Sequence, residues 1–258
     1  MIIRLSKLLI GIAVLVYGGA SATNNTKTIN DSSQQLSREF IERQVAQNMS
    51  VGKAIKSLVS HYPAHTHNVV SMALDLYPSS YREIVHSAIS AQPAISQEIV
   101  QIAIEKGITH CSKIVEAAII AEPSYVDFVV KTAVTAKPQE LANIVRIAVL
   151  TEPDSADSIV QTLATAYPNK IAEILETALE AVPFVGEYIV EALLAVFPSK
   201  AEDVIGIAVR ESLKDEANLL KILETAKAAG ISEKDLLNFA TTSGASEDQI
   251  RMALKTKE

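Results

Sequence analysis

This sequence lacks tryptophan, a second cysteine and any cluster of basic residues. One cysteine and no tryptophan occur in 258 residues, and aromatic residues make up 5%. A single cysteine excludes any disulfide bond within the chain. The 23 basic residues are outnumbered by 30 acidic ones and form no cluster. We therefore expect neither nucleic acid nor an anionic membrane surface as a partner, because both are bound through Lys and Arg.

Sequence motifs of enzymes are also absent. There is no glycine-rich phosphate loop, no G-x-S-x-G nucleophile turn and no H-E-x-x-H zinc motif. Glutamates are frequent, but they are spread along the chain at a regular spacing, which is typical of solvated helix faces. The sequence predicts no enzymatic activity and no cofactor.

Long hydrophobic runs are missing except at the N-terminus. Arg4 and Lys7 precede an apolar run over residues 8–17, and residues 20–22 form an Ala-Ser-Ala cleavage motif. This order predicts a signal peptide over residues 1–22 and an exported protein, periplasmic or secreted. The alternative, an uncleaved anchor, is disfavoured because a spanning helix needs about 20 apolar residues. We expect no membrane span in the mature chain.

What the sequence does contain is a strict spacing of proline. All nine prolines lie on one 15-residue grid, with a single slot missed, where Gly107 and Ile108 stand instead. A fixed period in turn residues is typical of repeat proteins, whose units bury their apolar faces by stacking on their neighbours. The prolines are Pro63, Pro78, Pro93, Pro123, Pro138, Pro153, Pro168, Pro183 and Pro198.

Within each unit, counted from its proline as position 1, the apolar positions are constant. Positions 7 and 8 are always aliphatic, position 11 is Ala or Leu, and position 12 is apolar. Spacings of three and four residues indicate a helix rather than a strand. Proline disfavours α-helical geometry in the residue before it, so each unit should hold one helix of about 11 or 12 residues. Polar residues at position 2, such as Ser124 and Asp154, are expected to cap these helices.

The units alternate in character, which gives a weaker period of 30 residues. With the unit at Pro63 counted as odd, position 4 is mostly smaller in odd units than in even ones, and seven of the eight aromatic residues between 63 and 212 lie in odd units. The simplest account is a pair of antiparallel helices every 30 residues. Odd helices would then form one layer and even helices the other.

The predicted fold is therefore all-α: an α-solenoid of about twelve short helices over residues 48–229, one per 15 residues, paired as 30-residue antiparallel hairpins. It resembles the α-solenoid class that includes HEAT and armadillo proteins, although their units are longer, at about 40 residues. The resemblance implies a scaffold with a broad binding face. Residues 23–47 are expected to form a disordered leader and a short helix. Residues 230–258 should form a small helical cap, with helices starting at Ser232 and Ser246.

Two aromatic residues stand at a position that is polar in most units. Phe128 and Tyr188 occupy position 6, and Tyr125 and Phe184 lie nearby in the same two units. Aromatic residues are enriched at protein-binding surfaces, so these four are the candidate partner-binding residues. The alternative is that they cover the turns of adjacent helices.

Three histidines surround the first proline, and the one cysteine lies near the missed slot. His61, His65 and His67 are weak candidates for Zn²⁺ or Cu²⁺ ligands. Their spacing straddles an expected turn, however, and solvated histidines are the alternative; we expect no metal. Cys111 stands where another unit carries Leu141, so it is expected to be a small buried apolar residue.

The repeat and the composition together predict an exported, non-enzymatic scaffold that binds a protein partner. One alternative is a structural or adhesive protein of the envelope or the extracellular space that self-associates through the ends of its array. Another is a metal-binding protein or an enzyme that uses the three histidines.

Overall fold

The structure of the chain is a computed structural model that describes residues 38–47 and 50–255. The chain divides into two units, Met1–Glu39 and Phe40–Glu258. The helical array lies in the second unit. The expected signal peptide over residues 1–22 lies outside the described residues, as does the leader as far as residue 37. Residues 40–46 are helical, as expected, and Ile41 is 1% exposed.

Every regular element in the described residues is helical, which confirms the all-α prediction. None of these helices is long and apolar enough to cross a membrane. The predicted array is formed by α2 (Val51–His61), α3 (Thr66–Leu76), α4 (Tyr81–Ala91), α5 (Ser96–Lys106), α6 (Cys111–Ala121), α7 (Val126–Ala136), α8 (Leu141–Thr151), α9 (Ala156–Ala166), α10 (Ile171–Ala181), α11 (Gly186–Val196), α12 (Ala201–Ser212) and α13 (Glu216–Ala228).

Each proline opens a three-residue 3-10 helix that leads into the next α-helix. The residue before the proline leaves α-helical geometry, as at Tyr62, where φ is −128° and ψ is 59°. Its N–H still donates to Leu58 O, and its carbonyl accepts from His65 N–H at 2.9 Å. The proline-led turns are η1 (Pro63–His65), η2 (Pro78–Ser80), η3 (Pro93–Ile95), η4 (Pro123–Tyr125), η5 (Pro138–Glu140), η6 (Pro153–Ser155), η7 (Pro168–Lys170), η8 (Pro183–Val185) and η9 (Pro198–Lys200).

The expectation that position 2 caps these helices was wrong. Ser124 and Asp154 are the middle residues of 3-10 turns, and neither α7 nor α9 has a side-chain cap. Ser124 Oγ instead donates to Glu122 Oε1 at 2.5 Å. Side-chain caps are unnecessary because the carbonyls of the 3-10 turn accept the first helical N–H groups, as Pro123 O does from Val126.

The slot without proline is bridged by a glycine. Helix α5 ends at Gly107, whose φ of 61° lies in the left-handed region that favours glycine. Helix α6 then begins at Cys111 without a preceding 3-10 turn. One loop of the array thus differs in shape from the other turns, although the helices on both sides keep their places.

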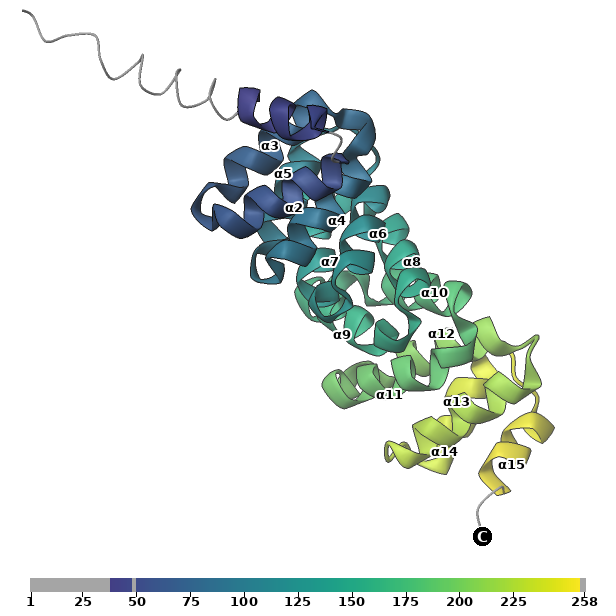
Figure 1. Cartoon of the computed structure of the whole chain (residues 1–258). Coiled ribbons are helices and arrows are strands. Elements are labelled where there is room, and N and C mark those ends of the chain that lie inside the picture. Colours follow the sequence, from purple (N-terminus) through teal and green to yellow (C-terminus); the bar gives the residue numbers. More distant parts are fainter. Residues whose placement is uncertain (1–37, 48–49, 256–258) are drawn as a thin grey trace, which may run out of the picture. The chain divides into compact units, whose positions relative to one another are not determined.

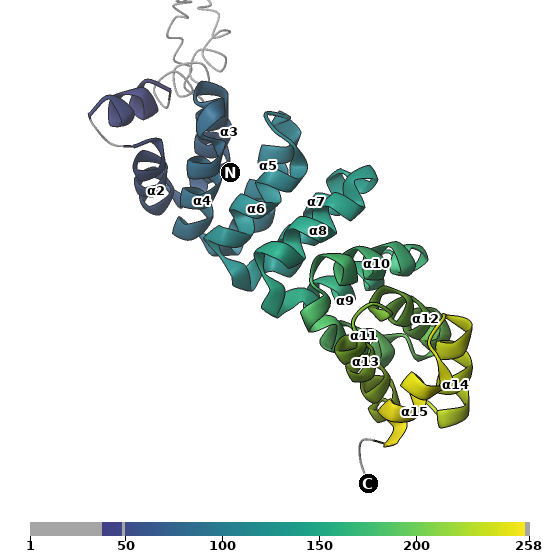
Figure 2. The ribbon, with the colours of Figure 1, turned by 90° about the vertical axis from the view of Figure 1, so that its right-hand side faces the viewer.

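The helices stack in two layers, as the 30-residue period predicts (Figures 1 and 2). Most helices of the array pack mainly against the second helix along the chain and less extensively against the next one; α12, at the C-terminal end, packs more on α13 than on α14. We call α3, α5, α7, α9, α11 and α13 the odd layer, and α2, α4, α6, α8, α10 and α12 the even layer.

The core is built from the columns that the sequence marked as apolar. Positions 7, 8, 11 and 12 are buried in every unit of the proline grid, with Ile84, Val85, Ala88 and Ile89 of α4 all at 0% exposure. An 11-residue helix is marginal by itself in water. Burying four such side chains, at about 1.5–3 kcal/mol for each large aliphatic one, makes the helix stable within the stack.

Polar contacts within a layer repeat the same 30-residue spacing. Lys106 Nζ lies 2.6 Å from Asp75 Oδ2, a separation of 31 residues. Arg146 lies 2.8 Å from Glu180 Oε2, a separation of 34 residues. These pairs join one helix to the next helix of the same layer.

Two further helices close the C-terminal end, α14 (Glu233–Thr242) and α15 (Glu247–Lys255). Their predicted starts are confirmed, because Ser232 Oγ accepts from Asp235 N–H at 3.1 Å and Ser246 Oγ accepts from Gln249 N–H at 3.3 Å. Helix α14 packs on α12. Position 9 of α12, which is polar in the other units, is the buried Gly206, and a Cβ there would lie 2.9 Å from Ser243 Oγ.

Deletions of one or two helices should separate a paired repeat from a single-helix repeat. Removing residues 123–152 deletes α7 and α8. Every later helix then stays in its own layer, odd or even, so a shorter array should fold. Removing residues 123–137 deletes α7 alone and forces even helices into odd places. That variant should lose at least about 3 kcal/mol, equivalent to one or two misplaced core side chains. Urea unfolding followed by circular dichroism measures both, and equal tolerance of the two deletions would contradict the paired repeat.

Candidate protein-binding face

The surface of the array is formed by the repeat positions whose side chains are not part of the core. Positions 6, 9 and 13 are exposed or partly exposed in nearly every unit, and most carry polar side chains. Phe128 of α7 and Tyr188 of α11 stand at position 6 and are 55% and 56% exposed. Both present large apolar surface to solvent, and the ring of Phe128 also packs against Tyr125 of the turn before α7.

The other two candidate residues extend the exposed aromatic surface. Phe184, in the turn before α11, is 60% exposed. Tyr125 is partly exposed and its ring centroid lies 5.8 Å from that of Phe128, with the two planes tilted by 41°. We call these four residues the aromatic face. Its two pairs lie on α7 and α11, which are separated in the odd layer by α9.

A carboxylate lies at the base of this face. Asp127 Oδ2 accepts a hydrogen bond from Ser158 Oγ of α9 at 2.6 Å. Its other oxygen, Oδ1, is buried and has no hydrogen-bond partner among the described residues. Buried polar atoms without a partner are uncommon, because each costs desolvation energy that nothing returns.

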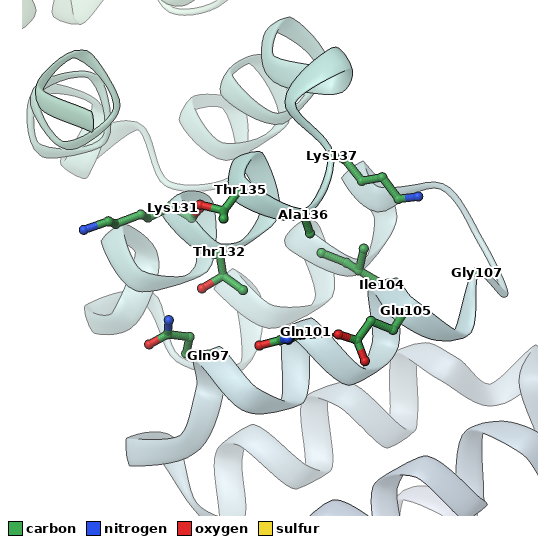
Figure 3. Close-up of a pocket in the computed structure, with 10 residues that line it drawn as sticks. All are labelled: Gln97, Gln101, Ile104, Glu105, Gly107, Lys131, Thr132, Thr135, Ala136 and Lys137. Carbon is green, nitrogen blue, oxygen red and sulfur yellow. Dashed lines mark hydrogen bonds between the residues drawn. The ribbon is translucent and has the colours of Figure 1, made fainter. Parts of the chain in front are cut away.

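A polar hollow of about 430 Å³ opens beside the aromatic face, between α5 and α7 (Figure 3). Its rim combines one carboxylate, that of Glu105, with the two cations Lys131 and Lys137, and it has no cysteine or histidine. The remaining lining residues are Gln97, Gln101, Ile104, Gly107, Thr132, Thr135 and Ala136.

The loop without proline forms a second hollow of about 540 Å³ that shares Ile104, Gly107 and Lys137 with the first. Cys111 borders it but is itself 3% exposed and unpaired, as expected for a small apolar residue. Burial raises the pKa of this thiol to about 11, with a further contribution from Glu140. The thiol is therefore a poor nucleophile at neutral pH.

Sequence reasoning missed a second exposed apolar surface, on the even layer. Ile120 of α6 and Leu150 of α8 are 53% and 52% exposed, and both stand at position 13 of adjacent helices. The other even units carry Ser90, Glu180 and Arg210 at this position. The same comparison of columns that identified Phe128 and Tyr188 would have found them.

The three histidines near the first proline are not gathered into one site. His61 Nδ1 lies 2.8 Å from Ser57 O of its own helix, and His67 Nδ1 lies 3.0 Å from Glu98 Oε1. His65 ends the turn between them. In the described part of the chain, no three His, Cys, Asp or Glu side chains are placed to hold one metal ion.

Comparison with protein-family models, with curated proteins and with solved structures finds no match to this chain. The assignment to the solenoid class therefore rests on its own helices, their layers and their spacing.

The burial of Cys111 predicts slow alkylation in the folded protein. With a pKa of about 11, its thiolate fraction at pH 8 is about 100-fold below that of an ordinary thiol, and burial hinders the reagent further. Iodoacetamide labelling followed by mass spectrometry should modify Cys111 only in urea. A Cys111→Ala variant that carries Ser199→Cys, at an exposed turn position, should label readily when folded. Equal rates for the two thiols would contradict the buried position.

Proposed function

We propose that this chain is an exported, non-enzymatic scaffold that binds a protein partner on its odd layer, through the aromatic face. The observation that carries the proposal is the exposure of Phe128 and Tyr188 at a column where other units are polar. Clusters of exposed aromatic side chains on an otherwise polar surface are typical of protein-binding sites.

The scaffold itself supports this proposal. Each array helix is anchored by its core columns, so the surface columns can vary without loss of the fold. The leader over residues 1–22 is the basis for placing the protein outside the cytoplasm, in the periplasm or in the medium. The polar hollow between α5 and α7 offers a single carboxylate and no paired nucleophile and base, so we propose no reaction there.

Replacing the two most exposed helix aromatics should abolish partner binding without unfolding the array. Phe128→Ala combined with Tyr188→Ala removes side chains that are more than half exposed, so the melting temperature should change by less than about 2 °C. The variant should no longer capture the protein that the mature wild-type chain retains from the native envelope fraction. Circular dichroism measures the melting temperature, and quantitative mass spectrometry measures the retained protein.

The matched control is Ile120→Ala combined with Leu150→Ala, which removes equally exposed apolar side chains from the even layer. This control should retain the partner in full. A large fall in melting temperature for the aromatic variant would assign Phe128 and Tyr188 a structural role, and loss of the partner from both variants would contradict a specific odd-layer site.

A second candidate function, self-association, is favoured by the even layer. Ile120 and Leu150 lie on adjacent helices and expose more than half of their side chains to solvent. Apolar side chains adjacent on a surface favour contact with another apolar surface, and a second copy of the chain supplies an identical one. This surface lies along the array and not at its ends.

Sedimentation velocity at several protein concentrations tests this candidate. If the even layer mediates self-association, the wild-type chain should form dimers as concentration rises. Ile120→Lys combined with Leu150→Lys should then remain monomeric, because a dimer would bury four unpaired cations. A concentration-independent wild-type monomer would exclude self-association by this surface.

A further inference from the structure

The aromatic face lies in the most one-sidedly acidic part of the odd layer. The segments 122–130, 152–160 and 182–190 form the turns and first helical turns of α7, α9 and α11. Together they contain six carboxylates and no Lys, Arg or His. Their acidic residues are Glu122, Asp127, Glu152, Asp154, Asp157 and Glu187. Within these segments the exposed aromatic rings have only acidic residues as charged neighbours, and the nearest cation along α7 is Lys131, at position 9.

The register of the repeat aligns one of these carboxylates with an aromatic residue of the next odd helix. In two pairs of odd helices, position 5 of one helix contacts position 6 of the next, 31 residues later. The measured examples are His67 with Glu98, at 3.0 Å, and Asp127 with Ser158, at 2.6 Å. The equivalent pair from α9 to α11 is Asp157 with Tyr188.

Among the acidic residues at position 5 in these helices, Asp157 is the one without an intramolecular partner. Asp127 is bonded to Ser158, and Glu187 Oε1 lies 3.3 Å from Lys221 Nζ. The side chain of Asp157 is partly exposed and forms no hydrogen bond or ion pair with the described residues. A carboxylate that lacks a cation next to an exposed tyrosine ring is suited to a guanidinium or ammonium group, which can form an ion pair and stack on the ring.

The spacing of the helices fits an extended peptide. Adjacent helices of a layer pack about 8–10 Å apart, so α7 and α11 are separated by about 16–20 Å. A polyproline II peptide advances about 3.1 Å per residue, or about 9 Å for every three residues. Side chains three residues apart therefore match successive odd helices.

We infer that the aromatic face, together with Asp157, binds an extended basic segment of the partner, with Lys or Arg side chains over Tyr188 and Phe128. This inference rests on the proposed function and specifies the chemistry of the partner. The cation next to Tyr188 pairs with Asp157. A second cation, about six residues away, stacks on Phe128.

The test uses a labelled nine-residue peptide, (Arg-Pro-Pro)₃, and the mature full chain. Its control is the same peptide with neutral citrulline in place of each arginine, which keeps the shape and removes the charge. Fluorescence anisotropy at low ionic strength should show the arginine peptide binding at least about tenfold more tightly than the citrulline peptide, since unscreened ion pairs and cation–π contacts both require the charge.

Variants locate the binding. Phe128→Ala combined with Tyr188→Ala should weaken the arginine peptide about tenfold, and Asp157→Asn about threefold, in keeping with exposed cation–π and ion-pair contacts. The matched control is Glu176→Gln, which removes one exposed carboxylate from the even layer and should leave affinity unchanged within about twofold. Circular dichroism of each variant checks that it is folded.

Three results would overturn the inference: equal binding of the two peptides, equal weakening by Asp157→Asn and Glu176→Gln, or no binding of the arginine peptide. None of them is the failure of the proposed function. If the aromatic variant still loses its captured partner while the arginine peptide is not bound, then the aromatic face binds a protein whose contact segment is not basic.

Discussion

Burial of four apolar columns between helices that are too short to be stable alone is the interaction on which this structure depends. A proline every fifteen residues ends each helix after about three turns, because the preceding residue is pushed out of α-helical geometry. Eleven residues then present an apolar stripe that only neighbouring helices can cover. The two layers and the separate closing helices at the C-terminus follow from this requirement.

The same regularity makes departures from a column informative. When nearly every unit places a polar residue at a surface position, a single apolar residue there has no role in the core. Phe128 and Tyr188 on the odd layer, like Ile120 and Leu150 on the even layer, are apolar at positions that are polar in most other units. All four side chains are more than half exposed. Gly206 departs in another way, since its position is buried and a Cβ there would lie 2.9 Å from Ser243 Oγ, just after α14.

Function, in this account, comes from side chains added to a uniform scaffold. The array supplies two layers of packed helices, and the aromatic face lies in segments that contain carboxylates and no cations. The loop without proline alters the surface locally: Gly107 permits a turn that leaves hollows on both sides of it, and Cys111 stays buried beneath them. The first hollow has a single carboxylate, and the second is lined by His110, Cys111 and Glu140, where burial raises the pKa of the thiol.

By itself the sequence determined the helices, their lengths and their alternation between two layers, and it marked Phe128 and Tyr188 as aromatic residues at a mostly polar position. These follow from proline and from aliphatic spacing, whose effects act over a few residues or recur in every unit. Only the tertiary structure decided that 3-10 turns replace side-chain caps, that Asp157 lacks a partner while Asp127 and Glu187 have one, and that the helices carrying Ile120 and Leu150 pack against each other. Such contacts join residues about 30 positions apart, so they depend on the distance between packed helices, which no local pattern specifies.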